Sequence, residues 1–381
     1  MEPWFTAEQE AFRSELRRFG AEQLAPHYQA DDRTGVLRPE LRRAMAGLGL
    51  LGLRIPEEYG GQGADCVTTG LAEEEVAIAD FNASYLILLT VLCSQIIVDA
   101  ADDRQKAQWL PQIANGEHLP ALALTEPDHG SDAARLGLRA VRDGAGWRLE
   151  GEKTSITFGA YAETAVVFAR TGGEGARGVS AFYVPLDERY VSRSAFADLG
   201  SRSTGRAALH FDGLPAPAGT LIGAEGAGFV QVMQGFDYSR ALIGLMCVGC
   251  ASASMAEAWE YVKQRQAFGQ PIGRFQGVAF PLVEHETLLR GARHLCYEAL
   301  WKKDRGQEHA VESNMAKWFA PKIAVEAAHQ ALLTFGHAGW SEESPLPQRM
   351  RDIIGLEIGD GTAQIAKLVV ARRILGREYA P

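Results

Sequence analysis

The spacing of apolar side chains divides the chain into three stretches with different periods. Over residues 6–118 apolar positions recur at helical spacing, as at Phe12, Leu16 and Phe19. Residues 119–229 change to short strand-like runs separated by turns rich in Gly, Asp and Pro, which predicts a domain of antiparallel strands. Beyond residue 230 helical spacing returns in long segments with short connections, which indicates a helix bundle.

The pattern predicts three domains: an N-terminal α-helical domain over 1–118, a middle β domain over 119–229 and a C-terminal helix bundle over 230–381. A Pro- and Gly-rich segment at 55–63 is predicted to be a plain turn, because no Lys-Ser/Thr pair follows it. The predicted helices are 8–24, 40–50, 71–79, 83–101, one from 103, 235–265, 275–305, 311–336, 347–355 and 362–375, and the predicted strands are 147–150, 165–170, 179–184 and 207–211.

Composition narrows the class of protein. A chain of 381 residues with 46% hydrophobic and 23% charged residues is typical of a soluble globular protein of two or three domains. The net charge of −10 argues against a nucleic-acid partner, which needs a basic surface. The longest uncharged apolar run, 241–256, is short for a membrane span and favours a buried helix without membrane insertion. No secretory signal is visible, and five scattered cysteines favour reduced thiols in the cytoplasm.

Candidate chemistry begins at residues 124–132, Leu-Thr-Glu-Pro-Asp-His-Gly-Ser-Asp. Pro127 interrupts regular structure, and Gly130 lets the backbone approach a ligand closely. Ser131 and Asp132 offer a hydroxyl and a carboxylate. Taken alone, this segment is a polar turn after a buried run.

Four further segments carry polar groups in distinctive strings: 151–157 (Gly-Glu-Lys-Thr-Ser-Ile-Thr), 236–240 (Phe-Asp-Tyr-Ser-Arg), 265–276 (Arg-Gln-Ala-Phe-Gly-Gln-Pro-Ile-Gly-Arg-Phe-Gln) and 351–365, which contains Gly-Asp-Gly-Thr. Each has an ordinary structural interpretation. These are a hairpin edge, a charge pair on a helix, a Gly-Pro turn, and a helix cap at Asp360.

Together, and at these separations, the five strings resemble the signatures of the acyl-CoA dehydrogenase family, with a cyclohexanecarbonyl-CoA dehydrogenase-like branch as one candidate. The resemblance runs nearly end to end. It implies a mainly α fold with a central β domain: an N-terminal helical domain, a middle β-barrel and a C-terminal four-helix bundle. It also implies FAD as cofactor, an acyl-CoA substrate, an electron-transferring flavoprotein as acceptor, and a homotetramer built as a dimer of dimers.

The resemblance assigns roles to individual positions. It implies that the segment at 265–276 reaches the FAD of a neighbouring subunit. This chain departs from the family pattern at Ser155, where many members have Trp, at Leu333, where Gln is common, and at 336–339, where Gly-His-Ala-Gly replaces Gly-Gly-x-Gly. The implied cofactor-binding residues are Leu122, Leu124, Thr125, Gly130, Ser131, Ser155, Thr157, Arg265, Phe268, Phe275, Gln276, Leu333, Gly336, His337, Thr362 and Gln364, and the implied substrate-binding residues are Ser131, Asp237, Arg240 and Gly361.

The resemblance makes Asp360 the catalytic base, at a position where the family has Glu. An α,β-desaturation removes a proton beside the thioester carbonyl and a hydride, which flavin N5 takes. The proton requires a carboxylate in a dry pocket, and the carbonyl requires donors aimed at its oxygen. The family supplies these donors from a ribityl hydroxyl of the flavin and from the backbone N–H of the base. Asp is one methylene shorter than Glu, and Gly355 and Gly359 add no bulk, so we expect room for a branched or cyclic acyl group such as cyclohexanecarbonyl-CoA.

Alternatives remain open at the level of sequence. The acyl group could be bound to a carrier protein, or the chain could be a flavin oxidase like nitroalkane oxidase, which uses Asp at the corresponding position. A flavin-binding protein without activity is disfavoured, because a carboxylate remains at the base position. No metal site is expected: Cys247 and Cys250 lie in an apolar helical run and are predicted to be a buried pair.

Overall fold

The computed structural model describes residues 5–376 and 378–381. The N-terminal part is helical, as predicted. Thr6 and Gln9 form a capping box that starts the first helix, and Asp80 caps the fifth by accepting from the backbone N–H groups of Asn82 and Ala83. The helices are α1 (Ala7–Phe19), continued by a π-helix (Gly20–Leu24), α2 (Tyr28–Thr34), α3 (Pro39–Gly47), α4 (Cys66–Ala79), α5 (Phe81–Ala100) and α6 (Asp103–Ala114).

A curled seven-stranded sheet follows, with strand order β1-β4-β2-β3-β7-β6 and β5 paired to β4. The prediction of an antiparallel domain was wrong in part, because β1 and β2 each pair with β4 in parallel. Parallel neighbours require a long crossover, and the β2–β3 hairpin lies within it. The strands are β1 (Pro120–Ala123), β2 (Arg139–Asp143), β3 (Gly146–Ile156), β4 (Thr164–Arg170), β5 (Val179–Pro185), β6 (Val191–Ala195) and β7 (Ala207–Ala216).

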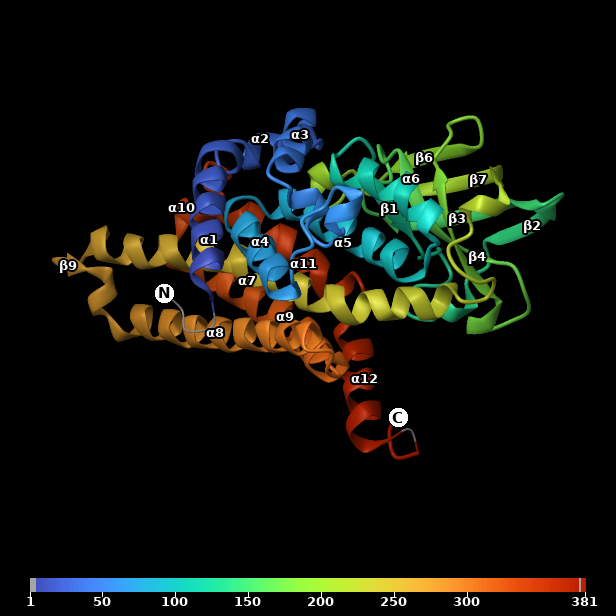
Figure 1. Ribbon diagram of the computed structural model, residues 1–381. Coiled ribbons are helices and arrows are strands. Elements are labelled where there is room, and N and C mark those ends of the chain that lie inside the picture. Colours follow the sequence, from blue (N-terminus) through green and yellow to red (C-terminus); the bar gives the residue numbers. More distant parts are fainter. Residues whose placement is uncertain (1–4, 377) are drawn as a thin grey trace.

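The C-terminal part is a bundle in which α7, α8 and α9 run side by side (Figure 1). A small hairpin of β8 and β9 joins α7 to α8 at the end of the bundle far from the sheet (Figure 1). The elements are α7 (Gly228–Gln264), β8 (Gln266–Ala267), β9 (Gln270–Pro271), α8 (Gln276–Asp304), α9 (Ala310–Phe335), α10 (His337–Trp340), α11 (Leu346–Ile358) and α12 (Ala363–Leu375). Short 3-10 helices occupy Leu50–Gly52, Glu57–Tyr59, Ala133–Arg135, Ala176–Gly178, Arg202–Thr204, Ala218–Thr220 and Ile272–Arg274.

Helix α7 begins at Gly228, earlier than the predicted start at Gly235. Glycine is unfavourable inside a helix. Here a Cβ at position 235 would lie 2.9 Å from Leu92 Cδ1, so glycine allows α5 and α7 to pack closely. With 37 residues, α7 is about 55 Å long and extends from the sheet to the far hairpin.

Helices α5 and α7 are the two described helices that are long and apolar enough to cross a membrane. Their apolar windows are 94% and 78% buried within the protein, so both are core helices. The predicted buried run 241–256 lies inside α7. Cys247 and Cys250 are buried free thiols, as predicted.

Candidate active site

Two of the predicted cofactor segments are joined directly. The backbone N–H of Thr154 donates to the carbonyl of Thr125 at 2.8 Å. Beside them the buried Lys153 Nζ donates to the Leu124 carbonyl at 2.9 Å and to Glu126 Oε1 at 2.8 Å. Burial lowers the pKa of Lys153 to about 8, and Glu126 opposes that shift. The Lys153–Glu126 pair therefore attaches the loop that follows β1 to strand β3.

The loop held in this way presents an open polar surface. Ser131 and Gly130 are exposed, and a Cβ at position 130 would meet nothing within 4 Å. Ser155 is also exposed and has φ 59°, at a point where the pairing of β3 with β7 shifts. A bulge of this kind redirects a side chain out of the sheet. Thr157, half-buried, lies just beyond.

Asp360 lies in the turn between α11 and α12, with φ 54°. A positive φ is uncommon for a residue other than glycine and often accompanies a functional constraint. The interpretation of Asp360 as a helix cap does not hold, because Thr362 caps α12 and its Oγ1 accepts from the Ile365 N–H at 3.4 Å. Over residues 5–376 and 378–381 we find no hydrogen bond to the Asp360 carboxylate. This carboxylate is therefore free to meet a ligand.

Two buried cations from other helices lie near this carboxylate. Arg240, 5% exposed, donates to Asp237 Oδ1 at 3.2 Å, and a Cβ at Gly361 would lie 3.6 Å from Arg240 Nη2. Lys317, 1% exposed, comes from α9. Burial raises the pKa of Asp360, whereas Lys317 and then Arg240 lower it. Asp360 itself is only half-buried and keeps some accessible surface.

The remaining predicted cofactor residues lie at the opposite end of the molecule. The β8–β9 hairpin and α10 are far from the sheet in Figure 1. Phe268 is 96% exposed there, and Arg265 is also exposed. Arg265 lies about 37 Å along α7 from Arg240, so one molecule bound near Asp360 cannot contact it in the same chain. The residues at the far end are Arg265, Phe268, Phe275, Gln276, Leu333, Gly336 and His337, whereas Leu122, Leu124, Thr125, Gly130, Ser131, Ser155 and Thr157 lie in or beside β1 and β3, and Gly361, Thr362 and Gln364 follow Asp360.

Both sets of residues are chemically suited to a dinucleotide. The set beside the sheet offers hydroxyl groups and an open glycine turn, and the far set offers a guanidinium with forked donors for a pyrophosphate. The residues fit FAD if two copies of the chain each contribute one set.

Sequence reasoning missed Lys317 and the Lys153–Glu126 pair. Lys317 stands in the otherwise apolar stretch 315–320 of α9, and a lysine is almost never fully buried unless a partner compensates its charge. That pattern was the available signal.

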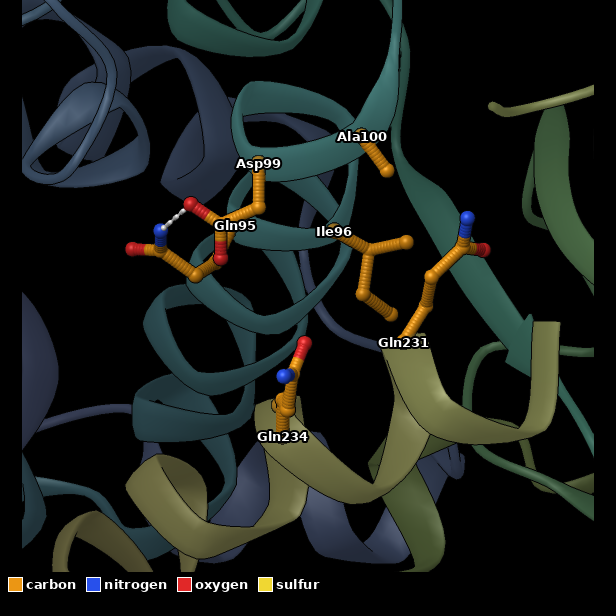
Figure 2. Close-up of a pocket in the computed structure, with 7 residues that line it drawn as sticks. Gln95, Ile96, Asp99, Ala100, Gln231 and Gln234 are labelled. Carbon is orange, nitrogen blue, oxygen red and sulfur yellow. Dashed lines mark hydrogen bonds between the residues drawn. The ribbon is translucent and has the colours of Figure 1, made fainter. Parts of the chain in front are cut away.

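A separate small pocket lies between α5 and the first turns of α7 (Figure 2). It is lined by polar groups that include Gln95, Asp99 and Gln234, and Gln95 Nε2 donates to Asp99 Oδ1 at 2.7 Å. Its volume of about 50 Å³ holds little more than water, and neither Asp360 nor Arg240 lines it. This pocket is not the site assembled around Asp360.

Comparison with known proteins identifies the class. The N-terminal, middle and C-terminal domain models of acyl-CoA dehydrogenases match residues 6–117, 121–214 and 226–375. The chain is 34% identical to a probable acyl-CoA dehydrogenase, YngJ, of Bacillus subtilis, over 97% of this chain and 98% of that protein. Butyryl-CoA dehydrogenase from Megasphaera elsdenii shares its fold with a TM-score of 0.94, at 31% identity over 98% of this chain and all of the other.

A prolyl acyl carrier protein oxidase, AnaB, is similar as well, with a TM-score of 0.93 at 26% identity over 97% of this chain and 99% of that one. The order of a helical, a sheet and a second helical domain is the order of the three acyl-CoA dehydrogenase domain models that match the chain. The chain belongs to the acyl-CoA dehydrogenase family. It is an FAD-dependent oxidoreductase of the acyl-CoA dehydrogenase type, which acts on a CH–CH group.

Proposed function

We propose that Asp360 is the base that takes the α-proton during dehydrogenation of an acyl thioester. The observation that carries this proposal is a carboxylate with no hydrogen-bond partner in the described chain, held at φ 54° beside two buried cations. Its pKa is raised by burial, which favours proton uptake, while Lys317 and Arg240 keep the ionised form accessible. The backbone N–H of Asp360 is suited to donate to the thioester carbonyl as charge develops on its oxygen.

FAD supplies the hydride acceptor for the β-hydrogen when it is bound. Thr125, Ser131 and Thr157 of one copy would hold it, together with Arg265 and the other residues at the hairpin end of a second copy. The distance along α7 supports this division, because one copy cannot supply both sets. A homotetramer arranged as a dimer of dimers satisfies this requirement. An electron-transferring flavoprotein is the acceptor we propose, and the buried free cysteines suit a cytoplasmic enzyme.

We propose a branched or cyclic acyl group such as cyclohexanecarbonyl. This proposal rests on the short side chain of Asp360 and on Gly355 and Gly359, which add no side-chain bulk near the turn. Turnover of cyclohexanecarbonyl-CoA should exceed that of straight-chain thioesters, and equal or better turnover of the straight chain would exclude this substrate assignment.

A carrier-protein thioester is the second candidate. The similarity to AnaB, an oxidase of prolyl groups on an acyl carrier protein, favours it. Activity on an acyl group bound to a carrier protein, without activity on the same group bound to CoA, would decide for this candidate.

Replacement of the base tests the main proposal. Asp360→Asn keeps the shape of the side chain but cannot accept the proton, so kcat should fall by about 10² to 10⁴. FAD content should not change. Glu308→Gln, at a side chain that is 90% exposed on the bundle, serves as the control and should leave kcat unchanged. Wild-type turnover by Asp360→Asn would refute the assignment.

A further inference from the structure

Lys317 is a buried cation whose partners are backbone carbonyls. It lies in the middle of α9, and its side chain is almost fully removed from solvent. Its Nζ donates to the carbonyl of Leu356 at 2.8 Å and to the carbonyl of Gly361 at 3.0 Å. Within residues 5–376 and 378–381 no carboxylate lies within salt-bridge distance of this ammonium group. A buried charge without an ion-pair partner is costly, so it requires an explanation beyond ordinary packing.

The two carbonyls stand on either side of the base. Leu356 lies in the last turn of α11, where helix carbonyls lack intrahelical partners, and Gly361 follows Asp360 directly. One ammonium group therefore ties together the two ends of the turn that carries Asp360. Asp360 and Gly361 both have positive φ, 54° and 98°. Such a conformation persists only where the surroundings hold it.

The charge of Lys317 also acts on the base. Among the groups that lower the pKa of Asp360, Lys317 comes before Arg240, and both oppose the larger effect of burial. Burial in turn lowers the pKa of Lys317, while Asp360 raises it. The titratable groups that face this pair are Arg240 and Cys247 of α7, Tyr85 of α5 and Glu357 of α11.

We propose that Lys317 is a positioning residue for the dehydrogenation, which clamps the Asp360 turn through the Leu356 and Gly361 carbonyls and keeps the base ionised. This inference rests on the proposed role of Asp360. It assigns to α9 a part in the reaction without contact with the substrate.

Lys317→Met tests the clamp, because methionine fills similar space without hydrogen bonds or charge. Without the positive charge the pKa of Asp360 rises, so the acid limb of the kcat profile should move to higher pH by about one unit or more. Activity below that limb should fall about tenfold per unit, and part of it should return when the pH is raised. Misplacement of the carboxylate should lower kcat more than it changes KM.

Two further variants sharpen the result. Lys322→Met removes a half-exposed lysine of the same helix, which pairs with Glu326, and should leave the pH profile unchanged. Lys317→Arg keeps the charge, so its acid limb should stay near the wild-type position even if kcat falls. FAD content and unfolding midpoint are measured for each variant. If Lys317→Met does not retain FAD, the comparison of Lys317→Arg with Lys317→Gln takes its place, with the same shift expected for the glutamine variant only.

The outcomes separate this inference from the proposed function. If Asp360→Asn abolishes turnover but loss of the Lys317 charge leaves the acid limb in place, the clamp is refuted and the base stands. An equal shift of the acid limb in Lys317→Arg and in the uncharged variant would also overturn the proposal, because the charge of Lys317 would then not keep the base ionised. If Asp360→Asn turns over normally, the base assignment fails and the clamp fails with it.

Discussion

The buried Lys153–Glu126 pair allows a quantitative prediction about the loop that carries the cofactor-binding residues. Lys153 is 0% exposed and Glu126 7%, and their side chains meet at 2.8 Å. Glu126 also accepts from the backbone N–H groups of Gly137 and Leu138. Lys153→Met would leave this carboxylate buried without its cation.

Removal of one partner from a buried ion pair typically costs about 3–5 kcal/mol, because the remaining charge stays desolvated. This range includes the free-energy cost of losing the hydrogen bond from Lys153 to the Leu124 carbonyl. Arg139→Met provides the matched control. Arg139 pairs with Glu150 at a similar 2.9 Å, but these side chains are 67% and 39% exposed. An exposed pair of this kind contributes about 1 kcal/mol or less.

The assay is urea unfolding, followed by circular dichroism and by release of the flavin. It is applied to Lys153→Met, to Arg139→Met, to Glu126→Gln and to the double variant that combines Lys153→Met with Glu126→Gln. Lys153→Met should lose several times more stability than Arg139→Met, and it should release flavin at lower urea because the loop at 124–131 loosens. The double variant should lose less than the sum of its single changes. If Lys153→Met and Arg139→Met are destabilised equally, burial does not govern this pair and the reasoning is wrong.

Two further predictions concern buried contacts near α11 and α5. A Cβ at Gly200 would lie 2.3 Å from the Arg351 carbonyl oxygen, so Gly200→Ala should push the loop at 199–201 off α11 and cost about 1–3 kcal/mol in urea unfolding, whereas Gly219→Ala, with nothing within 4 Å, should cost little. Burial raises the pKa of Asp80 from 3.8 to about 7, against the opposing backbone hydrogen bonds. The protonated Asp80 therefore contributes its full stability below about pH 3.8, and this contribution is lost as the pH rises through about 7. Asp80→Asn retains a good N-cap residue, so it should flatten the dependence of the unfolding free energy on pH between these values. An unchanged slope in that variant would contradict the burial argument.

Local patterns predicted much of this molecule, and contacts between distant segments account for the rest. The change of period predicted the helix, sheet and helix order, and the strings at 124–132 and 151–157 marked a loop and a strand that lie together. The parallel pairing of β1 with β4 depends on a crossover that no strand reveals alone. Helix α7 was predicted to begin at Gly235, but it begins at Gly228. Only the packing of α5 against α7 shows why a glycine stands inside the helix, since Leu92 occupies the space that a larger side chain would need.

The candidate site divides in the same way. Asp360 was predicted from its string. Only the structure shows that Asp360 does not cap α12, because the hydroxyl of Thr362 caps that helix. Lys317 escaped notice because a single lysine in a helix is normally solvated, and only the tertiary fold brings it to the Leu356 and Gly361 carbonyls. The hairpin residues around Arg265 were assigned from resemblance, and within one chain they remain far from the sheet.

Anaerobic addition of acyl thioesters to the FAD-loaded protein tests the central claim most directly. We predict that a branched or cyclic acyl-CoA bleaches the oxidised flavin absorbance of the wild-type chain. Asp360→Asn should bind the same thioester and stay yellow. Bleaching of Asp360→Asn at the wild-type rate, or a wild-type protein that no CoA- or carrier-bound acyl group bleaches, would contradict the account.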